Sequence, residues 1–88
     1  MPEISRFYGI VIKLIFKDDE QHHKPHVHVK YGDYKASVGI DGEVLAGRIP
    51  VKQYRMVLAW LSIHEDELYD AWNKAVNGVA FERIDPLS

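Results

Sequence analysis

The first half of the chain alternates polar and apolar side chains with the period of β-strands. The clearest case is residues 26–31, His-Val-His-Val-Lys-Tyr, whose alternation over six positions is typical of a half-buried strand. The two faces of this strand carry different side chains: Val27, Val29 and Tyr31 on one, and His26, His28 and Lys30 on the other. We therefore expect the two histidines to point the same way, ~6.5–7 Å apart along the strand.

Four more short runs have strand character and are separated by turn residues. They are residues 4–8, 10–16, 34–40 and 43–46. The run 10–16 is apolar and rich in β-branched residues, which predicts a central strand covered on much of both faces. Gly9 before it permits a bulge or a tight turn. Asp41-Gly42 lies between two strand-like runs and predicts a two-residue hairpin with a type I′ turn. Residues 31–47 should then form an antiparallel meander.

The second half of the chain changes to helical spacing, with apolar residues three and four positions apart. Pro50 suits the start of a helix, where its missing N–H costs nothing. A single helix from residue 50 to 77 would be about 40 Å long, which is too long for a domain with a radius of gyration of ~12 Å. Ser62 and Glu65 have capping-box spacing. We therefore predict helices over residues 51–61 and 63–77.

The end of the chain carries two further signals. Asn77-Gly78 predicts the stop of the second helix, and residues 81–84 are a candidate last edge strand. Together these elements predict one α+β domain spanning residues 1–88. We expect a small, mostly antiparallel sheet of four to six strands in the N-terminal half, with two C-terminal helices packed on one face.

Composition and charge narrow the classes of protein. The 88 residues carry a formal net charge of −2 and no cysteine, which excludes a disulfide framework, a thiolate zinc site and a cysteine nucleophile. The charge does not predict nucleic-acid binding by the chain as a whole, so contact with RNA would need a local basic patch. No secretory signal and no membrane-length apolar segment is evident. We expect a cytoplasmic protein.

The chemistry is concentrated in residues 22–28, which hold four of the five histidines. Imidazole titrates near neutral pH, so neighbouring histidines can divide acid and base roles. They can also bind a divalent transition metal, for which the candidate ligands are His22, His23, His26 and His28. The spacing matches no established metal motif. If the histidines act in proton transfer, no cofactor is expected. A third interpretation is that these histidines are solvated polar residues on the exposed face of a strand.

The residues also resemble a known family. The opening residues 1–10 (MPEISRFYGI), the strand Pro25-His26-Val27-His28-Val29 with Tyr31-Gly32, and the later residues Trp60, His64, Leu68 and Trp72 are similar to a small bacterial domain family of unknown function, DUF4160. The resemblance covers essentially the whole chain. It implies a role as the toxin of a type II toxin–antitoxin pair, because members are commonly encoded beside another small domain.

Three functional hypotheses follow. The first is a toxin that inhibits translation, acting as a metal-independent ribonuclease. His26 and His28 would supply base and acid, with His23 as a substitute for either; Arg6, Lys24 or Arg48 would stabilise the developing charge, and Tyr31 would orient a phosphate. The second is a histidine-rich metal-binding protein or metal-dependent hydrolase, and the third is a non-enzymatic interaction module. The expected partners are a small antitoxin encoded nearby and RNA or the ribosome, with self-association as a further alternative; no membrane partner is expected.

Overall fold

Five strands pair in the order in which they occur along the chain, each antiparallel to the next. This computed structural model describes residues 3–14 and 24–87. The strands are β1 (Glu3–Phe7), β2 (Ile10–Lys13), β3 (His26–Tyr31), β4 (Tyr34–Gly39) and β5 (Val44–Arg48). The predicted meander over residues 31–47 is confirmed, because β3, β4 and β5 are consecutive neighbours in the sheet.

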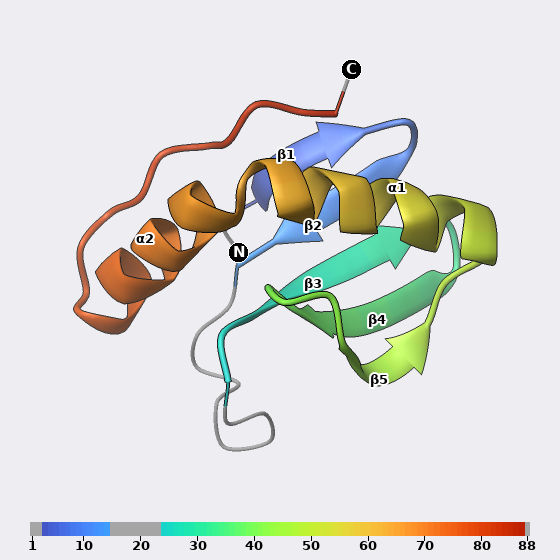
Figure 1. Cartoon of the computed structure of the whole chain (residues 1–88), viewed down its shortest axis with the longest axis horizontal. Coiled ribbons are helices and arrows are strands. Elements are labelled where there is room, and N and C mark those ends of the chain that lie inside the picture. The colour runs from blue at the N-terminus through green and yellow to red at the C-terminus, as the bar shows by residue number, and fades with distance from the viewer. Residues whose placement is uncertain (1–2, 15–23, 88) are drawn as a thin grey trace.

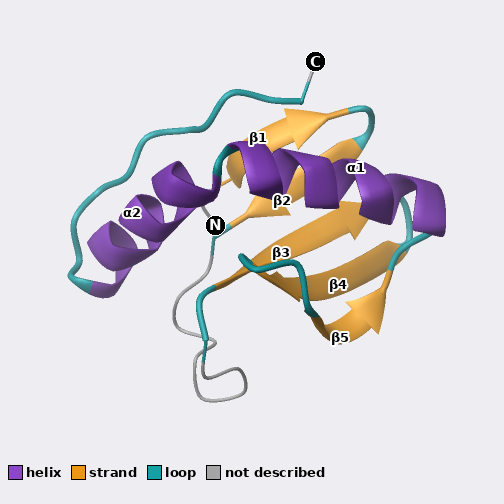
Figure 2. Cartoon of the chain, viewed as in Figure 1, coloured by secondary structure: helices purple, strands orange, loops and turns teal. Residues whose placement is uncertain are grey.

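Two helices follow the sheet, α1 (Val51–Ile63) and α2 (Glu65–Val76). Figure 1 shows α1 crossing the sheet and α2 turning away from it after a short break, and its colours show that the strands precede both helices along the chain. Figure 2 distinguishes the strands of the sheet from the two helices. The α+β class and the order of sheet and helices are confirmed. Neither helix in the described ranges is long and apolar enough to cross a membrane.

The helices cover one face of the sheet. Residues opposite one another on neighbouring strands share a face, and the set Ile12, Val29 and Ala36 forms such a row and is buried. Trp60 of α1 is fully buried above this face. Its ring centroid lies 5.6 Å from that of Phe7, and its Nε1 donates a hydrogen bond of 2.8 Å to the carbonyl oxygen of Asp85. One indole therefore joins the sheet, α1 and the C-terminal segment.

The prediction for the central strand is wrong in two respects. The middle strand of the sheet is β3, the histidine strand, and β2 lies one place from the edge. In β2, Ile10 and Ile12 are buried, but Val11 and Lys13 on the other face are only partly so. The helices supply cover on one side only, so β2 alternates although its sequence is nearly all apolar. Residues 15–16 of the predicted strand lie outside the described residues.

The two-residue turn predicted at Asp41-Gly42 is wrong, whereas the tight turn expected at Gly9 is present. Asp41 and Gly42 do not form a two-residue type I′ turn, because strand pairing stops at Gly39 and Asp41 has no positive φ. Asp41 instead accepts a hydrogen bond from the backbone N–H of Glu43 through its Oδ1. Tyr8 and Gly9 have φ values of 49° and 78°, as a type I′ turn requires, and join β1 to β2.

The helix break lies where it was expected but is made differently. α1 continues to Ile63, and His64 ends one helix and precedes the next without a side-chain capping bond. The predicted capping box of Ser62 and Glu65 is therefore wrong. The stop at Asn77-Gly78 is confirmed. Residues 81–84 form no strand, because only the N–H of Ile84 bonds to β1, at the carbonyl of Ile4.

Gly47 provides a test of the sheet. Gly47 and Gly78 have nearly the same φ, 73° and 72°, so Gly→Ala costs about 1–2 kcal/mol of backbone strain at either. At Gly47 the new Cβ would also overlap the carbonyl oxygen of Lys35 in β4, whereas it meets nothing at Gly78. We expect Gly47→Ala to lower the free energy of unfolding in urea clearly more than Gly78→Ala. Equal losses would contradict the observed β4–β5 pairing.

Candidate functional site

The sheet face opposite the helices carries His28 in a polar row. Lys13 of β2 and Ser37 of β4 lie opposite His28 on its two neighbouring strands, so the three side chains share that face. The Nδ1 of His28 and the Oγ of Ser37 are 3.5 Å apart. His28 and Lys13 are partly exposed. The row thus places one imidazole and one ammonium group on adjacent strands of the same face.

A second row of lysines runs beside the first. Lys30 of β3 lies directly opposite Lys35 of β4, and both are exposed. The two rows border a hollow of about 370 Å³. Among the described residues its lining contains no carboxylate: Lys13, His28, Val29, Lys30, Lys35, Ala36, Ser37, Ala46 and Gly47. We call this the cationic hollow. Three ammonium groups around one depression favour an anionic ligand.

His26 lies behind the hollow rather than in it. Its side chain is fully buried, with ring centroids 5.2 Å from both His28 and Trp72 of α2. The Nδ1 of His26 is 2.8 Å from the carbonyl oxygen of Lys24. A carbonyl can only accept, so Nδ1 carries the proton and the ring orientation is fixed. His26 therefore supports His28 by packing and is screened from a ligand.

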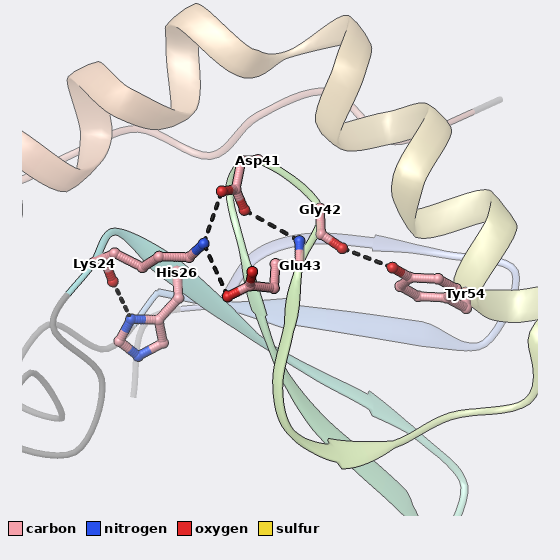
Figure 3. Close-up of polar contacts among 6 residues, drawn as sticks. All are labelled: Lys24, His26, Asp41, Gly42, Glu43 and Tyr54. Atoms are coloured by element: carbon pink, nitrogen blue, oxygen red, sulfur yellow. Dashed lines mark hydrogen bonds and ion pairs between the residues drawn. The ribbon is translucent and has the colours of Figure 1, made fainter.

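Lys24 is held in turn by the loop between β4 and β5. Its Nζ lies 2.7 Å from Oδ2 of Asp41 and 3.2 Å from Oε1 of Glu43, as Figure 3 shows. The hydrogen bond from Lys24 holds the pKa of Asp41 below its ordinary value, and the same bond raises the pKa of Lys24. Tyr54 of α1 fixes the loop by donating a 2.7 Å hydrogen bond to the carbonyl of Gly42. We call the ion pairs of Lys24 with Asp41 and Glu43 the ion-pair latch. The latch determines where the carbonyl oxygen of Lys24 meets His26.

The remaining predicted site residues do not gather at the cationic hollow. Tyr31 lies opposite Ile10 on the helix-covered face, so it cannot orient a ligand beside His28. Arg6 is bound to Glu3 at 2.7 Å, and this hydrogen bond lowers the pKa of Glu3. His22 and His23 lie outside the described residues, so the four-histidine metal set is not tested. Within residues 3–14 and 24–87, no three His, Asp or Glu side chains are grouped to hold a metal.

Sequence reasoning missed the lysines of the hollow. The alternation in residues 26–31 did indicate that Lys30 lies on the histidine face. No sequence pattern indicated the positions of Lys13 and Lys35 beside His28, because these depend on the register of β2 and β4 with β3. The overall charge of −2 also pointed away from a basic patch.

The fold and this face define a small α+β protein with one covered sheet face and one cationic sheet face. The model of the family described as domain of unknown function (DUF4160) matches residues 9–73, and the chain belongs to this family. The match includes β2 to β5, α1 and most of α2, and with them every residue that lines the cationic hollow. Comparison with curated proteins and with solved structures gave no match.

The Lys30–Lys35 pair should weaken the fold. Like charges directly opposite on an antiparallel pair are destabilising, typically by roughly 0.2–1 kcal/mol. We expect Lys35→Gln to raise the free energy of unfolding by this amount at low salt, and the gain to shrink as added salt screens the wild-type repulsion. Lys52→Gln, at an exposed lysine of α1, is the control and should change little. A loss of stability in Lys35→Gln would argue against the repulsion.

The ion-pair latch predicts a dependence of stability on pH. The pKa of Asp41 is lowered in the folded chain. The ionised carboxylate therefore stabilises the fold fully above the ordinary aspartate pKa of about 4, and this stabilisation is lost as the pH falls through the lower pKa of the folded state. Asp41→Asn keeps an oxygen for the Glu43 N–H but loses the charge. We expect wild type to exceed Asp41→Asn in urea midpoint at pH 7, by a small margin for an exposed pair, and the two midpoints to converge in acid. If the difference in urea midpoint between wild type and Asp41→Asn stayed the same in acid, the charge of Asp41 would not be its cause.

Proposed function

We propose that this chain is the toxin of a toxin–antitoxin pair and that it binds RNA in the cationic hollow to inhibit translation. The observation that carries the proposal is the grouping of Lys13, Lys30 and Lys35 with His28 around a depression whose described lining holds no carboxylate. The toxin role comes from the family resemblance of the sequence. The RNA ligand comes from the charge of this face, which supplies the local basic patch that a chain of net charge −2 needs for binding phosphates.

The chemistry we propose is cleavage by the 2′-hydroxyl. Neutral His28 accepts the proton of a ribose 2′-hydroxyl, and that oxygen attacks the neighbouring phosphorus. The 5′-oxygen leaves with a proton from a second group, for which His23 is the candidate from the sequence. The products are a 2′,3′-cyclic phosphate and a 5′-hydroxyl. Lys13 and Lys30 stabilise the charge that develops on the phosphate oxygens, and buried His26 keeps the His28 ring in place.

An antitoxin has two surfaces to use on this protein. It can cover the cationic hollow, or it can add a strand to the sheet. The outer edge of β1 already accepts a hydrogen bond from the N–H of Ile84, whereas β5 is the terminal strand on the other side of the sheet. Val44 of β5 is 43% exposed. The edge of β5 is therefore the side that we propose for strand addition.

The role of the hollow is tested by RNA affinity. Lys30→Gln/Lys35→Gln and Lys52→Gln/Arg55→Gln remove the same charge, the first pair from the hollow and the second from exposed positions of α1. We expect only the first pair to weaken binding of a labelled single-stranded RNA 12-mer. The slope of log affinity against log salt should also fall by about 1.4, since each phosphate contact on a single strand contributes ~0.7. Equal losses in both variants would show that binding depends on net charge alone.

The toxin role is tested in growing bacteria. Wild type, His28→Gln and His64→Gln are expressed from an inducible promoter, with the soluble amount of each checked. Gln keeps polarity without proton exchange, and His64 lies at the helix break with its Nδ1 2.7 Å from Glu67, outside the lining of the hollow. We expect growth arrest with wild type and His64→Gln but not with His28→Gln. Unimpeded growth with soluble wild type would overturn the toxin proposal, while RNA affinity would still be judged by the lysine variants.

A further inference from the structure

The strands at the two edges of the sheet differ in how they are covered. Three of the five residues of β1 are buried, and the carbonyl oxygen of Ile4 accepts a hydrogen bond from the N–H of Ile84. In β5, four of the five residues are exposed and only Leu45 is partly buried. No strand of the described residues pairs with β5 on its outer side. The outer edge of β5 is therefore of the kind to which an extended peptide adds.

The cationic hollow extends to this same edge strand. Among the described residues, β5 contributes only Ala46 and Gly47 to the lining, and Ala46 lies opposite Ser37 on the open face. The lining on β2 and β3 is built from longer side chains, Lys13 and His28 among them. Because the side chain of Ala46 ends at its Cβ, a side chain that extends over Ala46 from beyond β5 can enter the hollow.

A strand added to β5 would supply such a side chain. Residues opposite one another on neighbouring strands share a face of the sheet, so the residue that pairs with Ala46 would project from the open face. Neighbouring strands lie ~4.8 Å apart, which places the added strand ~10 Å from β4, at two strand spacings. Lys35 of β4 lies in the row next to Ser37 and Ala46. A glutamate on the added strand and Lys35 can therefore meet above Ala46.

Charge decides which kind of chain fits this edge. Within the described residues, three lysines and no carboxylate line the hollow, and Arg48 of β5 lies opposite Lys35. A second copy of this chain, paired through its own β5, would bring another Arg48 and another Lys35 to the same edge, and like charges across a sheet repel. Carboxylates would instead neutralise these groups. Charge complementarity thus favours an acidic partner over a second copy.

The backbone of β5 makes the charge more important. The register with β4 shifts between Ser37 and Val38, and Gly47 has a φ of 73°, so β5 is not a regular strand along its whole length. Irregularities of this kind disrupt a ladder of hydrogen bonds and discourage indiscriminate edge pairing. A partner that depends on backbone pairing alone gains little here, whereas a carboxylate in the hollow adds an interaction that the edge itself lacks.

We propose that the partner of this protein is an acidic extended segment that adds to β5 and places a carboxylate over Ala46 in the cationic hollow. This inference rests on the proposed function and specifies how the proposed RNA site is regulated. The β5 edge and the hollow act as one site, in which the carboxylate of the antitoxin competes with an RNA phosphate for Lys30 and Lys35. An apolar side chain of the same segment contacts Val44, which is 43% exposed.

Disulfide trapping tests whether such a segment adds to the edge. The chain has no cysteine, so Val44→Cys supplies a single thiol at β5. Val76→Cys is the control, at a residue of α2 that is 51% exposed. Each variant is equilibrated in a glutathione redox buffer with a synthetic peptide that alternates Glu with Thr and ends in one cysteine, or with a matched peptide in which Gln replaces every Glu. Mass spectrometry of the intact protein gives the fraction of mixed disulfide.

We expect Val44→Cys to retain the Glu peptide about two- to fivefold more than the Gln peptide, the effect of an opposite-charge pair across neighbouring strands. This preference should disappear when Lys30→Gln/Lys35→Gln is added, and Val76→Cys should show none. In the Glu adduct, the backbone amides of β5 should exchange more slowly with deuterium. The Glu adduct should also bind the labelled single-stranded RNA 12-mer more weakly than the Gln adduct, because its carboxylate occupies the hollow.

Three results would overturn the inference. Equal retention of the two peptides by Val44→Cys would show that the charge of the hollow has no part in binding. Unprotected β5 amides in the Glu adduct would show that no strand is added. Disulfide-linked dimers of Val44→Cys in excess of those of Val76→Cys would assign the edge to a second copy of this chain. The proposed function is judged separately, since failure of the peptide-free wild type to bind the RNA 12-mer would overturn that function alone.

Discussion

The structure depends on covering one face of a five-stranded meander and leaving the other bare. The apolar side chains that alternate along β3 and β4 form one face of the sheet. Helices α1 and α2 bury this face with residues such as Trp60 and Leu68. With no more than two helices available, the second face has no helical layer within residues 3–14 and 24–87. Polar side chains must occupy it, because exposed apolar rows would promote association. The position of the candidate site follows from this asymmetry.

The same asymmetry gives the two strand histidines different roles. Both point to the open face, but α2 extends past the start of β3 and Trp72 encloses His26. Burial of an imidazole requires hydrogen bonding, which the Lys24 carbonyl provides. His28, two residues further along, remains partly exposed beside Lys13 and Ser37. One histidine thus became part of the support, and the other is partly exposed on the open face.

Two local features are unfavourable for folding, and both lie toward the end of the sheet that holds the β1–β2 and β3–β4 turns. Lys30 faces Lys35 directly across the β3–β4 pair, and Tyr8 adopts a left-handed backbone that Asn or Gly would adopt with less strain. Departures of this kind from local preference are concentrated at functional sites, where a feature that costs folding stability contributes to function. A chain of formal charge −2 that places Lys30 and Lys35 side by side gathers positive potential on the open face of the sheet.

The sequence by itself determined the α+β class, the histidine strand with its two faces, the meander and the helix pair, because each depends on periodicity within a short segment. It also predicted the stop at Asn77-Gly78. Tertiary structure alone decided that Lys13 and Lys35 flank the histidine strand, since cross-strand neighbours are set by register. It also decided that Asp41 binds Lys24 instead of forming a two-residue turn, and that Trp72 buries His26. These contacts join residues far apart in sequence, and no local pattern of side chains encodes which distant partner fills a given position.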